Sequence, residues 1–567
     1  MLLRFFGRVF AFVFASLCYG ATVAQTIGLP DPSPEVRRQE QRQEQLRREL
    51  ERKPDVRLGD MPIEASTILP QEHPCRSITA VVFEGSDSLQ PALQNALAGT
   101  QGSDSPLGRC VGVKGIAVLI DRARNALIAQ GYITSRIEAP AQDLNDGRLL
   151  LRVVIGLVAT IAKGGDELSA WQLAPIEIDA PLQLRDIEQT LENLRRNPSV
   201  QADVQLRPGV QADTSDIVLD YTQHRPLRLN FTLDDSGSTT TGKLLGQATL
   251  SWDSPLGLSD LIYLSSSRDL GDREAGPRGN DSQTLHYSVP WGYWLWAITA
   301  SQSEYRQTIA GAFQSYLYSG QTQSQDMQLS RVVHRDTNSK TILQIKGFSR
   351  RSLNFIDDTE VLVQRRQTAG WEASVQHQQR FGELSGDINL SFKQGTGALG
   401  ALPAPEEAFG EGTSQMQIGT VVLNMQWPLP LPARLHATHH LRLQLNNTPL
   451  APQDRLCLGG RYSVRGFDGI QTLCGDRGYV TRNELNWTVN EHISTYIALD
   501  GGEVGGRSAQ ELPDRFLSGY AIGLRGQGRV ANDLAYSFDA FASQPLSKPE
   551  FLSTASTTAG FNLSLSF

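Results

Sequence analysis

The sequence lacks a long apolar segment after its N-terminal region. Beyond that region, the 567-residue chain contains no uninterrupted apolar stretch of about 20 residues, the length that a transmembrane helix requires. Aromatic residues make up only 7% of the chain, and the mean hydropathy is −0.28. This composition excludes a helical membrane protein, so any crossing of a membrane would have to use β-strands.

The sequence also lacks an excess of basic residues. Lysine and arginine number 52 against 60 aspartate and glutamate residues, which gives a net charge of −8. Loss of Arg4 and Arg8 with the N-terminal region leaves 50 basic residues and a net charge of −10. Because a nucleic-acid-binding surface needs a basic face, we expect no nucleic-acid partner.

Cysteine is scarce, and we find no motif typical of a metal site or an active site. No C-x-x-C pair, Cys/His spacing, phosphate-binding loop or catalytic triad is recognisable, and the nine histidines form no ligand cluster. We therefore expect no metal, no cofactor and no enzymatic activity. Apart from Cys18, the cysteines form two near pairs, which predicts disulfides Cys75–Cys110 and Cys457–Cys474, although four cysteines allow three connectivities.

Residues 1–24 have the features of a secretory signal peptide. Arg4 and Arg8 supply positive charge, residues 9–17 form a short apolar core, and residues 22–24 provide a small-residue cleavage site. We therefore expect an exported protein in an oxidising compartment, where disulfides persist.

Residues 25–53 are predicted to contain a polar α-helix. Ser33 can cap it, Pro34 suits its first turn, and Pro54 would stop it. Polar residues cover almost every side, so the helix has no apolar stripe to bury. It is either a free charged arm or a helix set in a polar pore. The proline-containing residues 54–74 are predicted to form an extended linker.

Two successive segments have the pattern of small α/β domains. In residues 75–156, a β-rich run precedes two helical segments, and a strand at residues 149–155 closes the domain. Residues 157–224 repeat this order more loosely, and their similar size indicates a repeat. The elements expected in the second segment are β-runs at 161, 176–178, 204–206 and 217–221 and a helix at 184–195.

Residues 225–567 consist of short alternating runs. Residues 441–446 and 561–567 alternate apolar and polar side chains cleanly. About sixteen such segments occur, and alternation of this kind is the signature of a membrane β-barrel. A soluble β-sandwich would show the same alternation. The signal peptide, the absence of a helical span and the terminal Phe567 favour the barrel.

A glycine-rich segment between two cysteines places an arginine between apolar side chains. It reads R-Y-S-V-R-G-F-D-G over residues 461–469, centred on Val464, Arg465, Gly466 and Phe467. Glycine permits unusual backbone conformations, and arginine can donate two hydrogen bonds to one carboxylate. An ordinary surface turn could have the same composition, but a disulfide-closed loop of this kind could also reach into another part of the protein.

In this context the chain resembles the TpsB transporters of two-partner secretion, within the superfamily of BamA-like barrels. The two α/β segments resemble POTRA domains, and the loop motif lies between the eleventh and twelfth predicted strands, like the family's sixth extracellular loop. The resemblance implies that this loop, residues 447–476, folds into the barrel. It also implies that Arg465 pairs with Asp500 of an aromatic-x-Asp-x-Gly motif, in which Ala498 replaces the aromatic residue. Residues 234–242 and 287–292 resemble two further family motifs.

The fold class expected is therefore a membrane β-barrel of about sixteen antiparallel strands, preceded by a plug helix and two α/β POTRA domains. The resemblance implies an outer-membrane translocator that exports one large TpsA-type exoprotein without nucleotide hydrolysis. That partner would be a haemolysin, an adhesin or a contact-dependent inhibition toxin. The POTRA domains would bind it in the periplasm, residues 25–53 would plug the barrel, and the protein would act as a monomer in outer-membrane lipid.

Two alternatives remain at this point. A barrel-assembly insertase of the same superfamily would share the barrel and the loop, but it usually has more POTRA domains and no plug helix. A passive porin would need no POTRA domain.

Overall fold

The computed structural model describes residues 31–51, 54–58, 68–85, 87–99, 102–165, 168–271, 277–430, 434–531 and 534–567. The expected signal peptide and the middle of the predicted linker lie outside these ranges. No helix among the described residues is long and apolar enough to cross a membrane.

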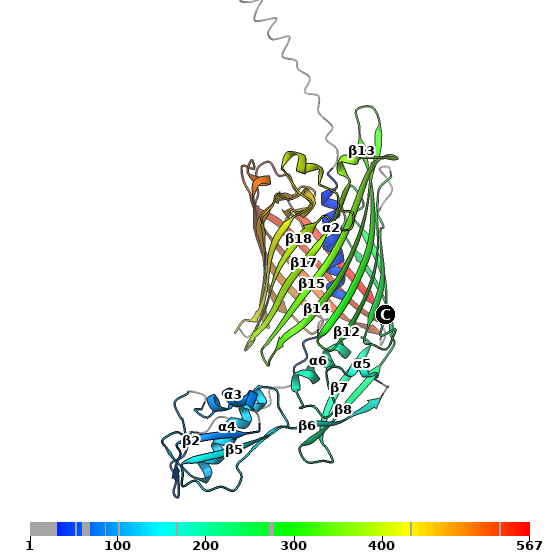
Figure 1. The fold of residues 1–567 in the computed structure, drawn as a ribbon. Coiled ribbons are helices and arrows are strands. Elements are labelled where there is room, and N and C mark those ends of the chain that lie inside the picture. Colours follow the sequence, from blue (N-terminus) through cyan, green and yellow to red (C-terminus); the bar gives the residue numbers. More distant parts are fainter. Residues whose placement is uncertain are drawn as a thin grey trace, which may run out of the picture.

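A closed antiparallel β-barrel forms the C-terminal part of the chain (Figure 1). Its sixteen long strands are neighbours in sequence order, and the last strand pairs with the first. The strands are β9 (Leu227–Asp234), β10 (Leu245–Asp253), β11 (Leu261–Asp269), β12 (Gly279–Trp291), β13 (Trp294–Ala310), β14 (Ser315–Arg335), β15 (Ser339–Ile356), β17 (Arg366–Phe381), β18 (Leu384–Thr396), β19 (Gln417–Pro428), β20 (Leu435–Asn446), β23 (Arg477–Thr488), β24 (Ile493–Gly505), β25 (Phe516–Ala531), β26 (Leu534–Ser547) and β27 (Thr558–Ser566). The short β16 (Thr359–Glu360) pairs with β15. The barrel confirms the fold class expected from the alternation.

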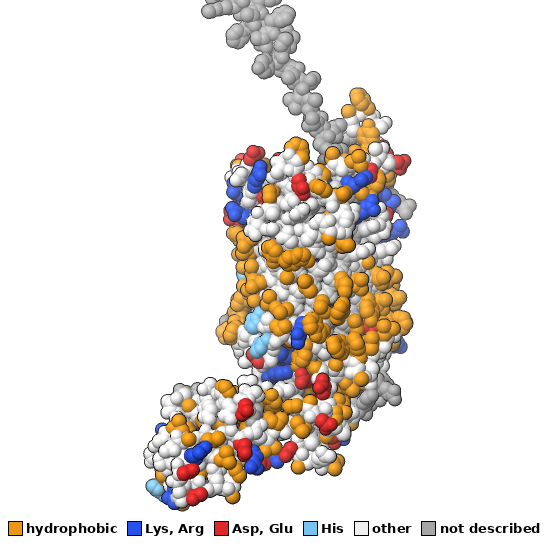
Figure 2. Space-filling view, in the orientation of Figure 1, with side chains coloured by type: hydrophobic (Ala, Val, Ile, Leu, Met, Phe, Trp, Pro, Cys, Tyr) orange, Lys and Arg blue, Asp and Glu red, His pale blue; other side chains and the backbone are white. Residues whose placement is uncertain are grey.

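Side chains of the barrel strands alternate between the lumen and the outside. In β24, Ile497 and Leu499 are 59% and 54% exposed, whereas Ala498 and Asp500 between and beside them are buried. Figure 2 shows hydrophobic side chains gathered in a band across the middle of the visible face of the barrel. An outward apolar band with polar residues inside is the arrangement that a lipid bilayer requires of a barrel.

Two small α/β domains precede the barrel and share one sheet topology. The first sheet has the order β2-β5-β4 and the second β6-β8-β7, each with one parallel and one antiparallel pairing. The elements of the first domain are β1 (Arg76–Ser77), β2 (Ala80–Glu84), η1 (Asp87–Leu89), α3 (Gln90–Ala96), β3 (Cys110–Val111), α4 (Val113–Ala129), β4 (Arg136–Glu138) and β5 (Arg148–Val154). Those of the second are β6 (Leu157–Gly165), α5 (Ala170–Leu173), α6 (Leu184–Arg195), β7 (Val200–Pro208) and β8 (Thr214–Gln223).

The β-run expected at residues 176–178 does not form a strand. Pro175 and Pro181 flank this segment, and proline cannot donate a ladder hydrogen bond. Ile176 packs into the core of the second domain, whereas Ile178 is 56% exposed. The segment is therefore a loop that contributes one apolar side chain.

The polar helix α2 (Ser33–Leu50) lies inside the barrel (Figure 1). It begins after Pro32 rather than after a Ser33 cap, and it ends three residues before the expected boundary at residue 53. Its surface is not wholly polar, because Leu46 and Leu50 pack on Leu261 and Tyr263 of the wall. This apolar contact at the last turns was missed because two leucines on one helix end are too few to form a stripe.

The described parts of the predicted linker are attached to the α/β domains. Leu69 donates its N–H to Asp104 at 2.8 Å, and Glu72 accepts three N–H bonds at the start of α4. Residues 54–58 lie against α6 and the end of β14. The extended linker is thus anchored near both ends.

The second α/β domain contacts the barrel at the turn between β12 and β13. Trp171 donates to the carbonyl of Pro290 at 2.6 Å, and Asn193 donates to that of Gly292 at 2.9 Å. The Tyr293 hydroxyl donates to Asp186 at 2.6 Å. Residues 287–292, singled out in the sequence, therefore lead into the turn that seats this domain under the barrel.

Candidate functional site: the loop and the helix in the barrel lumen

The loop of residues 447–476 is folded around its own small β-hairpin. Its strands β21 (Leu456–Leu458) and β22 (Leu473–Gly475) place Cys457 opposite Cys474, and a disulfide joins the two. A second disulfide joins Cys75 and Cys110. The loop also contains the short helix η4 (Pro452–Asp454).

The loop has its own hydrophobic core, which packs onto the barrel wall. Val464 and Phe467, on either side of the Arg465-Gly466 tip, are 0% and 3% exposed. They belong to a buried cluster with loop and wall residues Leu456, Leu458, Leu473, Val480, Val504, Ala509, Leu517 and Leu552. The apolar side chains that flank the arginine therefore anchor the loop, and they fix where the arginine points.

Arg465 points at Asp500 of β24, and both are almost completely buried. Its Nε and Nη2 donate to the two carboxylate oxygens at 2.6 and 2.8 Å, and its backbone N–H donates to Oδ2 at 3.1 Å. Both residues are 2% exposed. Two parallel donors on one carboxylate form the bidentate pair for which arginine is suited.

Glu484 of β23 is a second acceptor that the sequence analysis missed. It receives Nη1 of Arg465 at 2.5 Å and Nη1 of Arg525 at 2.8 Å. Arg525 of β25 also donates to Asp539 of β26 at 2.7 Å. The guanidinium of Arg465 thus belongs to a network in which acidic and basic side chains alternate across the neighbouring strands β23 to β26. The sequence did contain a signal for Glu484, because a charged residue in a membrane-barrel strand is expected to face the lumen. Its partners could not be identified, because that requires the strand register.

Tyr496 provides the aromatic side chain that the Asp500 motif lacks at Ala498. In β24, residues 496, 498 and 500 all face inward, since side chains two apart share a face. The ring of Tyr496 lies 5.7 Å from the guanidinium carbon of Arg465 and 4.0 Å from that of Arg525. Its hydroxyl donates to Asp539 at 3.0 Å. The aromatic contact is therefore made from a position two residues earlier.

Two glycines allow the loop tip to approach the wall closely. Gly466 has a φ of +108°, and a Cβ there would lie 2.5 Å from the Gln544 carbonyl oxygen. A Cβ on Gly519 of β25 would lie 2.0 Å from the Arg465 carbonyl oxygen. Both positions therefore require glycine for the observed contact between the loop and strands β25 and β26.

Helix α2 contacts both this loop and the barrel wall. Arg38 donates to the carbonyl of Gly469 at 2.6 Å, and Arg37 donates to that of Pro452 at 2.9 Å. On the wall side, Glu40 pairs with Arg350 of β15, and Glu51 lies 3.2 Å from His286 of β12. Helix and loop thus occupy the lumen together and hold each other through polar contacts.

Another loop arginine contacts the seam between the first and last strands. Arg461 donates to Asp235 at 2.9 Å and to the carbonyl of Phe561 at 3.2 Å. Asp235 also accepts the N–H of Phe561 at 2.8 Å. The motif at residues 234–242 therefore meets the loop where β9 pairs with β27.

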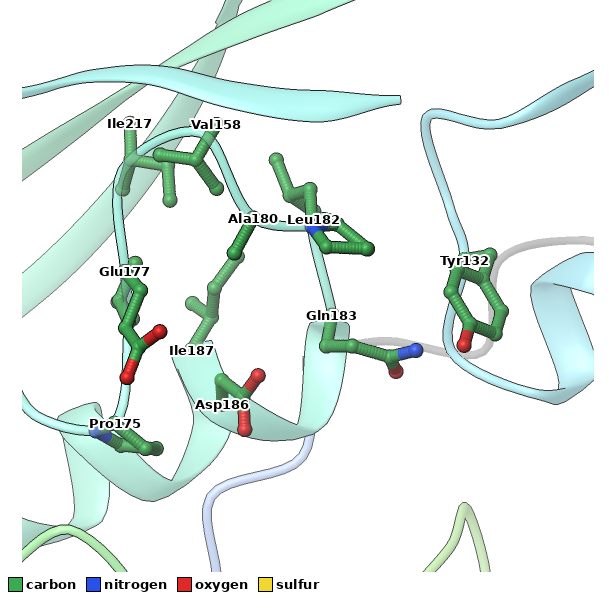
Figure 3. Close-up of a pocket in the computed structure, with 12 residues that line it drawn as sticks. Tyr132, Val158, Pro175, Glu177, Ala180, Leu182, Gln183, Asp186, Ile187 and Ile217 are labelled. Atoms are coloured by element: carbon green, nitrogen blue, oxygen red, sulfur yellow. The ribbon is translucent and has the colours of Figure 1, made fainter. Parts of the chain in front are cut away.

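A cavity of about 290 Å³ lies in the second α/β domain, beside the first (Figure 3). Apolar residues such as Val158 and Ile187 line it, Tyr132 of the first domain lies at one side, and the carboxylates of Glu177 and Asp186 face its rim. Burial raises the pKa of Asp186; the hydrogen bond from Tyr293 opposes that shift and Glu177 adds to it. In the described residues, no group of three or more His, Cys, Asp or Glu side chains is arranged to hold a metal ion.

Comparisons with known proteins identify the architecture. Residues 213–526 match the model of the haemolysin secretion/activation proteins ShlB/FhaC/HecB. The chain belongs to this family. Residues 77–156 match the ShlB-type POTRA domain and residues 158–208 match a further POTRA domain. The α/β repeat inferred from element order is therefore confirmed as a pair of POTRA domains.

Relatives and solved structures cover nearly the whole chain. It is 32% identical over 527 residues to the outer membrane transporter CdiB-2 of Burkholderia pseudomallei, with 89% of this chain and 88% of that protein aligned. It is 28% identical to the haemolysin transporter protein ShlB of Serratia marcescens, over 78% and 77% of the two chains. The structure of CdiB from Acinetobacter baumannii superposes with a TM-score of 0.81 at 28% identity, covering 95% of this chain and 100% of that one.

Proposed function

We propose that this protein is an outer-membrane transporter of two-partner secretion, which moves one large exoprotein from the periplasm to the cell surface. Membership of the ShlB/FhaC/HecB family supports this function, as do its relatives, which are named as outer-membrane and haemolysin transporters. The barrel lies in the outer membrane, and the POTRA domains lie in the periplasm.

The observation that carries the proposal is the plug helix in the lumen. A sixteen-stranded barrel encloses a wide channel that has to be blocked at rest. Helix α2 spans about 27 Å at 1.5 Å per residue, close to the thickness of the bilayer core. The contacts of Arg37, Arg38 and Glu40 with the loop and the wall are polar, so water can replace them when the helix leaves, whereas Leu46 and Leu50 give up an apolar contact with the wall. The helix is thus a removable plug, and the channel that it vacates accepts an unfolded chain.

The POTRA domains are the proposed binding site for the exoprotein. In the described part of the chain, β7 pairs with β8 only, so its other edge is open to an extended segment. Exposed Leu206 and the neighbouring cavity of the same domain offer apolar contacts to side chains of such a segment. Binding requires no cofactor and no chemical step, so we propose a translocator without enzymatic activity that acts as a monomer in outer-membrane lipid.

A barrel-assembly insertase or a passive porin fits these features less well. Two POTRA domains and a helix inside the lumen match a transporter that opens for one class of partner. A passive porin would need neither the POTRA domains nor the helix in the lumen.

Deletion of the plug helix tests the function. We expect removal of residues 31–50 to leave a folded barrel with a higher ion conductance in a planar bilayer, because the wide lumen is no longer filled. In cells that also produce a candidate exoprotein of the TpsA type, the full chain should release its own partner into the medium. Unchanged conductance of the deletion variant, or no dependence of secretion on the barrel, would refute the proposal.

A further inference from the structure

Residues 54–58, which follow the plug helix, are held between the second POTRA domain and the barrel. The N–H of Val56 donates to Glu192 of α6 at 3.0 Å, and its carbonyl accepts Nη2 of Arg335 at 2.6 Å. The N–H of Leu58 donates to Glu188 of α6 at 3.0 Å. Both sides of this short backbone segment are therefore bonded, one by the POTRA domain and one by Arg335 at the end of β14.

The charged groups of this contact form a buried network. Arg335 also donates to Glu192 at 2.7 Å and to Glu188 at 3.2 Å, and Lys340 of β15 donates to Glu192 at 2.5 Å. The four side chains are between 2% and 9% exposed. Buried charges with all these partners hold a defined geometry, and removal of one partner leaves the others uncompensated.

Val56 also has an apolar anchor. Its side chain is 6% exposed and belongs to the hydrophobic core of the second POTRA domain, together with Ile187 and Leu191. The segment therefore contributes to the packing of that domain and does not simply lie on its surface. We define the contact of Val56 and Leu58 with Glu188, Glu192 and Arg335 as the tether clamp.

The clamp sets the length of free chain available to the plug. Between Leu50, the last residue of α2, and Val56 lie five residues, with a reach of about 17 Å at 3.3 Å per residue. The helix itself is about 27 Å long. With the clamp closed, this reach is shorter than the distance of about 27 Å that the helix has to move along the barrel axis to leave the lumen. Release of the clamp extends the free chain to Leu69, which is bonded to Asp104, and adds about 43 Å of reach.

We propose that the tether clamp is a second latch on the plug, so that α2 leaves the lumen only after the clamp opens. This inference rests on the proposed plug function. It assigns control of the channel to the junction between the second POTRA domain and the barrel, outside the lumenal contacts of the helix.

Planar-bilayer conductance of the full-length protein tests the clamp. Val56→Asp puts a carboxylate beside Glu192 and removes the apolar anchor, and Arg335→Gln removes the charge that bonds the Val56 carbonyl. Each should raise the open fraction about tenfold, the effect of losing roughly one charged hydrogen bond. Tyr293→Phe is the matched control, because it removes a POTRA–barrel hydrogen bond that does not involve the tether, and it should leave the open fraction unchanged.

A longer tether provides a test that does not disturb the clamp. Eight Gly/Ser residues inserted between residues 53 and 54 add about 26 Å of reach. The insertion should open the channel as the clamp variants do, and combination with Val56→Asp should add little.

The outcomes separate the two proposals. If plug deletion raises conductance but neither the insertion nor the clamp variants do, the clamp inference is wrong and the plug remains. If plug deletion itself has no effect, both are wrong. If Tyr293→Phe opens the channel as much as Arg335→Gln, general loosening of the POTRA–barrel contact explains the result and the clamp is rejected.

Discussion

Replacement of Arg465 by alanine should undock the lumenal loop and stop secretion, while the barrel still assembles. The substitution removes two side-chain donors from Asp500, which keeps the backbone N–H and a distant Arg482 at 3.9 Å. Glu484 is less affected, because Arg525 continues to donate to it. The loss therefore falls mainly on one buried carboxylate.

The burial of the pair determines the magnitude. The side chains of Arg465 and Asp500 are 2% and 0% exposed, so the contact is drier than an open lumen implies. Removing one partner of a buried ion pair costs about 3–5 kcal/mol. That corresponds to a shift of about 10² to 10⁴ in the ratio of docked to undocked loop. Glu484→Gln should have a smaller effect, since each arginine keeps one carboxylate.

A charge exchange tests whether geometry or simple attraction matters. In the double variant Arg465→Asp with Asp500→Arg, the new aspartate would face Glu484, and the backbone N–H at position 465 would lose its acceptor. We therefore expect almost no recovery. Arg465→Lys should be intermediate, because one ammonium keeps the charge but cannot reproduce the fork.

One assay compares the amount of exoprotein in the medium with the amount of folded barrel in the outer membrane. A second assay measures protease protection of the loop in the purified protein. Arg529→Ala, at an exposed arginine of β25, is the control and should match the wild type. If Arg465→Ala retains a protected loop and normal secretion, or if the charge exchange restores most secretion, the reasoning is refuted.

Two further predictions concern the loop contact and the first POTRA domain. Gly519→Ala should undock the loop without changing any charged residue, because the new Cβ would lie 2.0 Å from the Arg465 carbonyl oxygen. Gly347→Ala is the control and should leave the loop docked, because no atom lies within 4 Å of a Cβ at that position. Equal protease protection of the loop in both variants would contradict the prediction. Burial opposes ionisation of Asp104, but the Leu69 N–H, Arg122 and Arg109 outweigh it and hold the pKa of Asp104 below its usual range. A lowered carboxyl pKa stabilises the fold above the unfolded value of about 4, and this stability is lost as the pH falls through the folded pKa. Asp104→Asn should therefore lower the calorimetric unfolding temperature of the first POTRA domain at pH 7, and the difference from wild type should shrink below about pH 4; a constant difference would exclude the carboxylate as its cause.

The sequence by itself determined the order of the parts. The polar helix, the two α/β repeats and the alternating strands are patterns of period 3.6 or 2, which a local stretch specifies without reference to its neighbours. The loop motif could be placed between the eleventh and twelfth strands because strands can be counted along the chain. The resemblance then pointed to Asp500, and the structure brings its carboxylate to Arg465.

Only the tertiary structure decided which inward side chains meet. Glu484, Arg525 and Tyr496 lie on three different strands, and their contacts depend on strand register, which local alternation leaves open. The position of α2 in the lumen and the attachment of Val56 to α6 join residues that are far apart in sequence. A polar helix and a proline-containing linker have no apolar pattern to specify a partner, so their places follow from the charged and backbone groups that the folded barrel and the POTRA domain present to them.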